Sequence, residues 1–274
     1  MLTDSQVESW LREDVGHHDV TNDVPGETTG RLVATEAGVA AGLDAAAAVF
    51  EYLDLEVDRR VDAGAFVDAG ATVLTVAGPA RAVLRGERAA VNVAAHASGV
   101  ATATRRAVAA ARDATEGERE VRIAATRKTT PGLRGVEKRA VAAAGGDTHR
   151  LDLSHMVMVK DNHVAELGLE RAVERFRERA SLATKVEVEV EDPADAPRAA
   201  AAGADLVLLD NMSPATTADA VERLRAADAD ALAEASGGIG VEDVPDYAAT
   251  GVDVVSMGAL THSAPALDYS FRTG

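Results

Sequence analysis

The chain has 274 residues, no cysteine and a formal net charge of −17, with 45 acidic against 28 basic residues. This length allows one large domain or two smaller ones with a sizeable core, and the lack of cysteine excludes disulfides and thiolate metal sites. The acidic balance argues against sequence-independent binding of nucleic acid and against docking on anionic membranes.

The composition is also unusual in its low content of aromatic residues and of lysine. Alanine is abundant, aromatic residues make up only 3% of the chain, and nearly all basic residues are arginine. This is typical of proteins from halophilic organisms, whose molar salt shortens the Debye length to about 3 Å and screens surface repulsion. Three of the four lysines, Lys128, Lys138 and Lys160, fall in one region, which indicates a use for them there. Neither a signal peptide nor a membrane span is predicted, so we expect a cytoplasmic protein.

The first part of the chain, residues 1–107, mixes helical and strand-like patterns. We expect helices at 5–13, 43–54 and about 87–111, and strands at 30–40 and twice within 65–85. The Ser98–Gly99 pair interrupts the longest helical pattern and predicts close packing or a kink there. These patterns predict an α/β layer domain.

From residue 108 to 264, short apolar runs alternate with helical patterns. The expected strands are 121–126, 156–160, 186–191, 206–210, 231–236 and 252–257, and the expected helices are about 134–144, 165–181, 193–202, 214–227 and 241–249. Such alternation predicts a parallel sheet with helices outside, and six or seven units favour a barrel. The final residues, 265–274, alternate like an edge strand that could return to the first domain or close the barrel.

Polar residues follow each of the six predicted barrel strands. In parallel α/β folds the functional groups lie at the carboxyl ends of the strands. Here those ends carry Thr126, Arg127 and Lys128; Lys160; Glu189; Asp210; Ser236, Gly237 and Gly238; and Ser256, Met257 and Gly258. One mouth of the barrel is therefore expected to collect cations, carboxylates and glycine loops.

The two glycine-containing loops come after the last two strands, where barrels commonly bind phosphate. Ser236–Gly238 and Ser256–Gly258 would let backbone N–H groups approach an anion, with a helix N-terminus behind them. An ordinary tight turn is the alternative for a pair of glycines.

Glu189 and Asp210 are acidic residues at a cationic mouth. They could bind Mg²⁺ through water or accept hydrogen bonds from sugar hydroxyls. The alternative is a buried ion pair with Lys160 or Lys128. Since side chains alternate by twos, Glu187 and Glu191 share the phase of Glu189, and the sequence leaves open which of them faces the site.

The densest cationic set in the barrel is suited to a substrate with several anionic groups. Arginine binds carboxylates with two parallel hydrogen bonds, whereas lysine acts as a mobile point charge suited to phosphate. The set comprises Arg127, Lys128, His149, Arg150 and Lys160. Surface residues that balance the acidic surface are the alternative. The histidines lack the spacing of a zinc site.

Several segments together resemble one enzyme family. They are TRKTTPGLRGVEKRAV (126–141), GGDTHR (145–150), VMVKDNH (157–163), GERAAVNVAAHASGVAT (86–102), VEVEVE (186–191), LVLLDNM (206–212), EASGGI (234–239) and TGVDVVSMGALTHS (250–263). In order and spacing, this set resembles the signature of the quinolinate phosphoribosyltransferases over nearly the whole chain.

The resemblance implies an N-terminal α/β sandwich domain, 1–107, and an open α/β barrel of fewer than eight strands, 108–264. It implies transfer of phosphoribose from phosphoribosyl pyrophosphate with Mg²⁺ to quinolinate, with decarboxylation to nicotinate mononucleotide, and a homodimer or homohexamer with shared sites. By the same resemblance, Arg88 would come from a neighbouring subunit. Arg127, Lys128, His149, Arg150 and Lys160 would surround quinolinate and the phosphates, Glu189 and Asp210 would meet ribose and Mg²⁺, and the Ser236 and Ser256 loops would hold the 5′-phosphate.

The chain departs from the family pattern at Ala125, Thr148, His155 and His18, which puts the support around the substrate contacts in doubt. Other functions stay open at this point. They are a molybdenum-associated paralogue, a nicotinate-specific transferase, a Schiff-base aldolase with Lys160 as nucleophile, and a regulatory protein that binds anions without turnover.

Overall fold

The computed structural model describes residues 2–117 and 119–274, which divide into two compact units. The first unit comprises the residues up to Arg105 with Thr129–Gly145 and Ser263–Gly274. The second comprises Arg106–Lys128 and Gly146–His262. Thr129–Gly145 groups with the first unit although the expected domain 108–264 includes it, and the domain limits stay a prediction.

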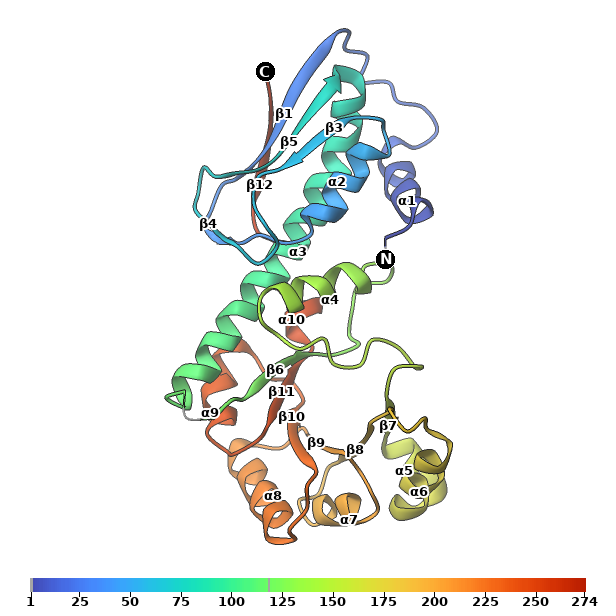
Figure 1. Ribbon diagram of the computed structural model, residues 1–274, viewed down its shortest axis with the longest axis vertical. Coiled ribbons are helices and arrows are strands. Elements are labelled where there is room, and N and C mark those ends of the chain that lie inside the picture. Colours follow the sequence, from blue (N-terminus) through green and yellow to red (C-terminus); the bar gives the residue numbers. More distant parts are fainter. Residues whose placement is uncertain (1, 118) are drawn as a thin grey trace. The chain divides into compact units, whose positions relative to one another are not determined.

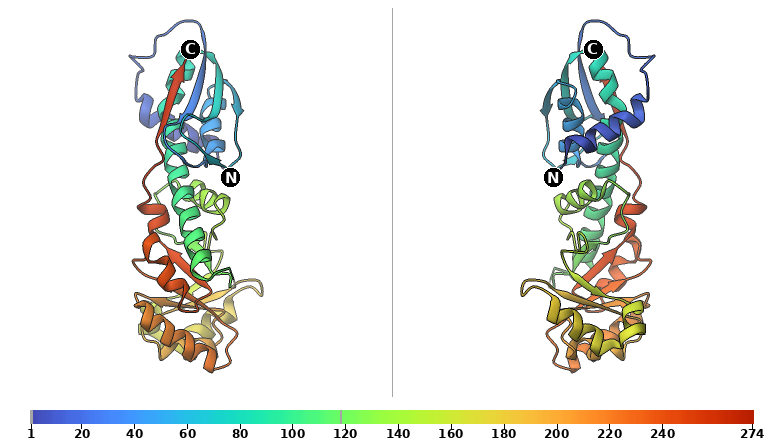
Figure 2. Two further views of the ribbon diagram at one scale, coloured as in Figure 1. Left: turned by 90° about the vertical axis from the view of Figure 1, so that its left-hand side faces the viewer. Right: turned by 90° about the vertical axis from the view of Figure 1, so that its right-hand side faces the viewer.

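The first unit is built on a four-stranded antiparallel sheet with the strand order β12-β1-β5-β3 (Figure 1). Its strands are β1 (Glu27–Ala34), β3 (Glu56–Arg59), β5 (Thr72–Pro79) and β12 (Tyr269–Thr273). The C-terminal strand β12 pairs with β1, with Phe271 opposite Leu32, and Figure 2 shows the two lying side by side. The end of the chain therefore returns to this sheet.

Helices and a small two-stranded ladder complete the first unit. They are α1 (Asp4–Val15), β2 (Gly38–Val39), α2 (Leu43–Glu51), β4 (Phe66–Val67) and α4 (Arg134–Ala143). Phe50 of α2 is fully buried and stacks on Phe271 of β12, with ring centroids 5.7 Å apart. Burying an aromatic side chain of this size contributes about 2–3 kcal/mol, so this contact ties α2 to the sheet.

The long helix α3 (Ala80–Ala114) runs without a break through Ser98–Gly99. The buried Ser98 hydroxyl accepts the Ala41 N–H at 2.9 Å and lies 3.0 Å from the Tyr269 hydroxyl. A side chain at Gly99 would collide with the carbonyl of Pro265. Small residues stand here because two other segments pack against the helix, so the kink that the sequence left open is absent.

The second unit contains six parallel strands in the order β6-β11-β10-β9-β8-β7 (Figure 1). They are β6 (Arg122–Ala125), β7 (Val157–Val159), β8 (Val186–Val190), β9 (Leu206–Asp210), β10 (Leu232–Ser236) and β11 (Val254–Met257). Strands β6 and β7 are not paired with each other, and Asp147 forms an isolated parallel bridge with Ala124 on the outer side of β6. The predicted fold class, an α/β layer unit with an open α/β barrel of fewer than eight strands, is confirmed.

Helices follow the strands of the second unit. They are α5 (Asp161–Leu167), α6 (Leu169–Arg179), α7 (Asp195–Ala201), α8 (Pro214–Ala226), the 3-10 turn η1 (Val241–Asp243), α9 (Val244–Ala248) and α10 (Ala259–His262). The single helix expected at 165–181 is two, because Gly168 has a φ of 79° that helix geometry does not allow. The Ser213 hydroxyl caps α8 by accepting the Thr216 N–H at 3.2 Å.

In the part of the chain that the structure describes, none of the helices is both long and apolar enough to cross a membrane.

Candidate active site

A pocket of about 410 Å³ lies at the carboxyl ends of the barrel strands in the second unit. Every strand of the barrel contributes to its wall, directly or through the residues that follow it. The lining residues are Thr126, Arg127, Lys128, His149, Arg150, Met158, Lys160, Glu189, Leu208, Asp210, Asn211, Glu234, Ser236, Gly237, Gly238, Ser256 and Gly258. The structure thus brings together the predicted barrel residues, except Met257.

The register of the strands explains why these side chains share one face. Glu189 lies opposite Leu208, which lies opposite Glu234, and one layer nearer the mouth Asp210 lies opposite Ser236. Because side chains alternate along a strand, residues in the same phase point into the barrel together. Glu187, one layer deeper, has the same phase and is fully buried, so both Glu187 and Glu189 face inward.

Arg150 places a guanidinium in the wall of the pocket while little of it meets solvent. Its exposed fraction is 8%, one terminal nitrogen lies 3.4 Å from the Met158 sulfur, and its buried Nε has no hydrogen-bond partner among the described residues. Burial, followed by repulsion from Arg127, lowers the pKa of Arg150. A buried donor without a partner is costly, and an anionic ligand would supply the missing acceptor.

His149 lies beside Arg150 and reaches two buried carboxylates. Its Nε2 is 3.0 Å from Glu234 Oε2 and 3.5 Å from Glu187 Oε1, and both glutamates are fully buried. Burial lowers the pKa of His149, but hydrogen bonding to Glu187 and Glu234 and their charges outweigh it and raise the pKa to about 10. Burial and then the neighbouring Glu234 raise the pKa of Glu187. The ring is therefore a cation near neutral pH.

Two carboxylates face these cations from neighbouring strands. Glu189 forms an ion pair with the Lys160 ammonium group, so the alternative of an internal pair is realised, inside the pocket. Asp210 accepts the side-chain N–H of Asn211 at 2.6 Å. The Lys160 N–H donates to His163 Nδ1 at 2.9 Å, which holds the turn that presents Lys160.

The loops that follow Asp210 and Ser236 approach each other closely. Asn211 has a φ of 55° and its N–H donates to the Ser236 carbonyl at 2.9 Å. Gly237 has a φ of 99°, and an added Cβ would lie 2.6 Å from the Asn211 nitrogen. The helices behind the two glycine-containing loops are short, so an anion here would depend on the loop N–H groups rather than on a long helix dipole.

We expect Gly237→Ala to weaken binding of a phosphate-bearing substrate at least tenfold, because the methyl group both strains a positive φ and collides with Asn211. Gly238→Ala is the matched control, since it has a φ of 64° but meets nothing within 4 Å. Titration calorimetry of phosphoribosyl pyrophosphate against both variants tests this. Equal affinities would contradict a phosphate-binding role for the tight approach at Gly237.

Three residues singled out in the sequence lie elsewhere. Arg88 belongs to α3 in the first unit, where it lines another pocket with Trp10 and Glu13. Lys138 is buried in α4 of that unit and does not line the pocket at the barrel mouth. Of the three clustered lysines, Lys128 and Lys160 line the pocket and Lys138 does not. The Met257 side chain is fully buried and points away from the pocket, because it is out of phase with Ser256 and Gly258.

Sequence reasoning missed Glu234, Met158 and Leu208 as lining residues. Glu234 carried a usable signal, since it is the one acid in strand β10 and is in phase with Ser236. Apolar Met158 and Leu208 could be assigned to the pocket only once the register was known.

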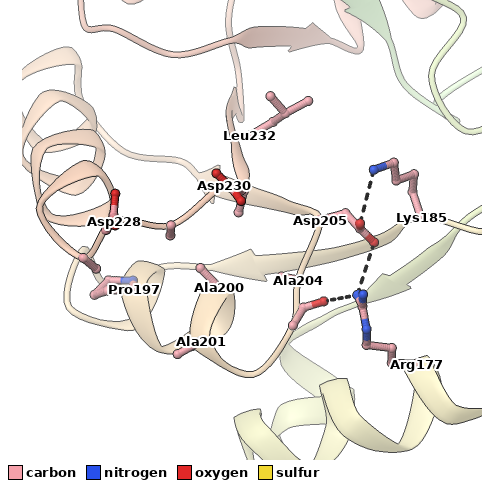
Figure 3. A pocket seen from close by; sticks show the side chains of 14 residues that line it. Arg177, Lys185, Pro197, Ala200, Ala201, Ala204, Asp205, Asp228, Asp230 and Leu232 are labelled. Carbon is pink, nitrogen blue, oxygen red and sulfur yellow. Dashed lines mark hydrogen bonds and ion pairs between the residues drawn. The ribbon is translucent and has the colours of Figure 1, made fainter.

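A larger pocket of about 620 Å³ lies at the opposite ends of the strands. Figure 3 shows Arg177 and Lys185 both turned toward Asp205, at distances of 3.5 and 3.2 Å. It is lined by the loops that lead into β8, β9 and β10. In barrels this end contributes to stability rather than to catalysis, and Arg177 and Lys185, which line this hollow, both pair with Asp205.

Comparison with known proteins matches both parts of the chain to one enzyme family. Residues 18–98 match the family described as quinolinate phosphoribosyl transferase, N-terminal domain, and residues 100–272 match its C-terminal domain. The chain is 45% identical to a probable nicotinate-nucleotide pyrophosphorylase [carboxylating] of Methanothermobacter thermautotrophicus, covering 97% of each chain. It is 43% identical to the nicotinate-nucleotide pyrophosphorylase [carboxylating] of Homo sapiens, covering 97% of this chain and 90% of the human one.

Solved structures are also similar to this chain along its whole length. The crystal structure of NadC from Streptococcus pyogenes is 37% identical and superposes with a TM-score of 0.89, covering 100% of this chain and 98% of that one. The nicotinate-nucleotide pyrophosphorylase from Francisella tularensis is 30% identical with a TM-score of 0.90, over 100% and 98% of the two chains.

Proposed function

The chain belongs to the quinolinate phosphoribosyltransferase family, and from this premise we propose how its pocket performs the family's reaction. The enzyme is a pentosyltransferase of NAD biosynthesis, which transfers phosphoribose from phosphoribosyl pyrophosphate to quinolinate and releases pyrophosphate and CO₂. The assignment of individual residues to that reaction is our proposal.

The observation that carries the proposal is the cationic wall made by Arg127, His149 and Arg150. Quinolinate has two neighbouring carboxylates on a flat ring, and planar guanidinium groups bind such groups with paired hydrogen bonds. The unpartnered, buried Nε of Arg150 supports a ligand that supplies an acceptor. A monocarboxylate would leave part of this buried charge without a counterion, which favours the dicarboxylate.

Glu189, Asp210, Lys128 and Lys160 suit the other substrate. Two carboxylates on neighbouring strands offer the hard oxygen ligands that Mg²⁺ prefers, and both already have protein partners, which fits contact through water. When bound, Mg²⁺ neutralises charge on the diphosphate. The backbone N–H groups of the Gly237–Gly238 and Gly258 turns would hold the 5′-phosphate.

In the proposed mechanism, the bond between ribose C1 and the pyrophosphate oxygen breaks, and both electrons leave with the oxygen. Glu189 and Asp210 stabilise the positive charge that develops on the ribose, while Lys128 and Lys160 stabilise the departing pyrophosphate. The quinolinate ring nitrogen forms the new bond to C1. The bond to the 2-carboxylate then breaks, the electron pair stays on the ring carbon beside the positive nitrogen, and that carbon takes up a proton. Most of the catalysis is positioning and fixed charge.

Arg88 is proposed to act across a subunit interface, in a homodimer or homohexamer. In the monomer it is exposed in the first unit and pairs only weakly with Glu87 at 3.5 Å, which leaves it available to a second copy. The cytoplasmic location also stays a prediction.

The substrate is tested by comparing quinolinate with nicotinate, each with phosphoribosyl pyrophosphate and Mg²⁺, followed by chromatography of the nucleotide product. We expect turnover with quinolinate and at least a hundredfold lower kcat/KM with nicotinate, because one carboxylate contact is lost. Preference for nicotinate would overturn the dicarboxylate assignment. Binding of both ligands without turnover would point to a regulatory protein.

We further propose that the acidic surface is an adaptation to salt. The net charge of −17 repels itself in dilute buffer, and molar salt screens that repulsion. Raising KCl from about 0.1 M to about 2 M is expected to raise the Tm by on the order of 10 °C in scanning calorimetry. A neutral osmolyte at equal osmolality is the control. A Tm that is unchanged or lower in KCl would contradict the adaptation.

A further inference from the structure

We propose that Glu234 is a positioning residue that keeps the His149 ring doubly protonated and fixed, so that its second ring N–H faces the pocket as a donor to a substrate carboxylate. This inference rests on the proposed function, because it assigns the anion that His149 meets. It adds a residue that acts through His149 and sets the binding chemistry of that ring.

The geometry around the ring leaves little freedom. His149 Nε2 lies 3.0 Å from Glu234 Oε2 and 3.5 Å from Glu187 Oε1, and both glutamates are fully buried. The His149 side chain itself is only 10% exposed and lines the pocket. The ring therefore spans the distance between two buried acids and the space where a ligand binds.

The backbone fixes the ring from the other side. His149 has a φ of 50°, an uncommon conformation for a residue with a side chain, and its N–H donates to Asp147 Oδ1 at 2.6 Å. Asp147 is in turn bound to β6, accepting the Ala125 N–H at 3.0 Å and donating to the Ile123 carbonyl at 2.7 Å. Strain of this kind persists where surrounding contacts determine it, and it is common at functional sites.

The protonation state of the His149 ring decides whether its Nδ1 is a hydrogen-bond donor or an acceptor. Nε2 must carry a hydrogen to donate to Glu234, so in a neutral ring Nδ1 would hold only a lone pair. A lone pair repels a carboxylate, whereas a second N–H donates to it with a charge-assisted hydrogen bond. Keeping the ring cationic thus gives Nδ1 an N–H to donate in place of a lone pair.

The charged groups around the His149 ring have opposing effects on its protonation. Glu187 and Glu234 favour the cation from below, and they raise the pKa of His149 to about 10 against the opposing effect of burial. Arg127 and Arg150 also line the pocket and, as like charges, oppose a further positive charge there, while Glu189 and Lys160 are paired with each other. Glu234 is the nearer of the two acids, so its removal should lower the pKa of His149.

The test is Glu234→Gln, which keeps the size and an acceptor oxygen but removes the charge. Nitrogen NMR of the histidine rings, with the His149 signal identified by its loss in His149→Gln, reports protonation directly. We expect an imidazolium at about pH 8 in the unmodified protein, because its pKa lies well above the ordinary value of about 6.5. In Glu234→Gln we expect its midpoint to fall by at least about one pH unit.

Kinetics supply the second readout. The KM for quinolinate is expected to be flat from about pH 6 to about pH 9 in the unmodified enzyme, and in Glu234→Gln to rise at least about twofold by about pH 9. The KM for phosphoribosyl pyrophosphate should stay level in both. A purely structural role for Glu234 would lower activity at every pH alike.

Glu137→Gln is the matched control. It removes the charge from another fully buried glutamate that contacts a histidine, His96, at 2.8 Å in the first unit. It is expected to leave the His149 signal and the pH profile of the quinolinate KM as they are.

Each outcome decides the proposal. A neutral His149 at about pH 8 in the unmodified protein, or an unchanged His149 midpoint in Glu234→Gln, would overturn it. If Glu234→Gln does not fold, the titration of the unmodified protein decides alone. Because NMR needs no turnover, lack of activity with quinolinate would count against the proposed function while the protonation of His149 was still measured.

The pH dependence of the free energy of unfolding tests the same raised pKa of His149. A histidine whose pKa is raised on folding stabilises the protein below its unfolded value of about 6.5, and that stabilisation is lost as the pH rises toward about 10. The free energy of unfolding should therefore fall between these pH values in urea titrations, more steeply in the unmodified protein than in Glu234→Gln. Parallel curves would contradict the coupling.

Discussion

Arg150→Met is expected to lower kcat/KM for quinolinate by on the order of 10³-fold, since two hydrogen bonds to an ionised carboxylate contribute about 1.5–3 kcal/mol each. Methionine keeps much of the side-chain volume but offers no donor. The loss should appear in the KM for quinolinate and in kcat, while the KM for phosphoribosyl pyrophosphate changes little. Steady-state kinetics with each substrate varied in turn measure this.

We expect Arg150→Met to lower activity without lowering the stability of the protein. Arg150 is a buried cation with an unpartnered Nε and a lowered pKa, so in the absence of ligand it costs the fold more than it contributes. We therefore expect Arg150→Met to keep or raise the Tm. Arg223→Ala is the control, since Arg223 is an exposed arginine on α8 paired with Asp219, and its loss should leave kinetics unchanged. Near-normal turnover in Arg150→Met would remove Arg150 from the substrate site.

Lys160→Met is expected to lower kcat by on the order of 10²–10³-fold, because it removes a charge from the pyrophosphate and leaves Glu189 without its partner. Lys160→Arg should keep part of the activity, since the charge remains but its shape differs. Turnover under saturating substrates measures the effect.

Lys185→Met is the matched control for this change. Lys185 also pairs with a carboxylate in the same unit, Asp205 at 3.2 Å, but at the opposite ends of the strands. Its loss should change turnover less than about twofold. Equal effects of the two substitutions would show that loss of an ion pair, rather than of a group in the pocket, explains the result. Trapping of a carbonyl substrate on Lys160 by borohydride would instead favour an aldolase.

The strand-end rule located most of this site from the sequence alone. Arg127, Lys160 and Asp210 each follow a recognisable apolar run, and in a parallel barrel such ends must meet at one mouth. Resemblance added only Arg88 and the sharing of sites between subunits, which no pattern within one chain could predict.

Other features depend on information that a pattern does not carry. The alternation of Glu187, Glu189 and Glu191 leaves their direction open until the pairing of β8 with β7 and β9 fixes it. Glu234 was passed over because a lone acid in a strand has no partner in the sequence, and His149 lies 85 positions away. The unbroken α3 was uncertain because its small residues reflect what packs against it, which only the fold reveals.

The central claim is that this pocket joins quinolinate to phosphoribose and removes one carboxylate. The measurement that tests it most directly is the stoichiometry of products in molar KCl, with quinolinate labelled in its 2-carboxylate, phosphoribosyl pyrophosphate and Mg²⁺. We predict labelled CO₂, pyrophosphate and nicotinate mononucleotide in equal amounts. Folded protein that releases none of them, or that releases pyrophosphate without labelled CO₂, would contradict the account.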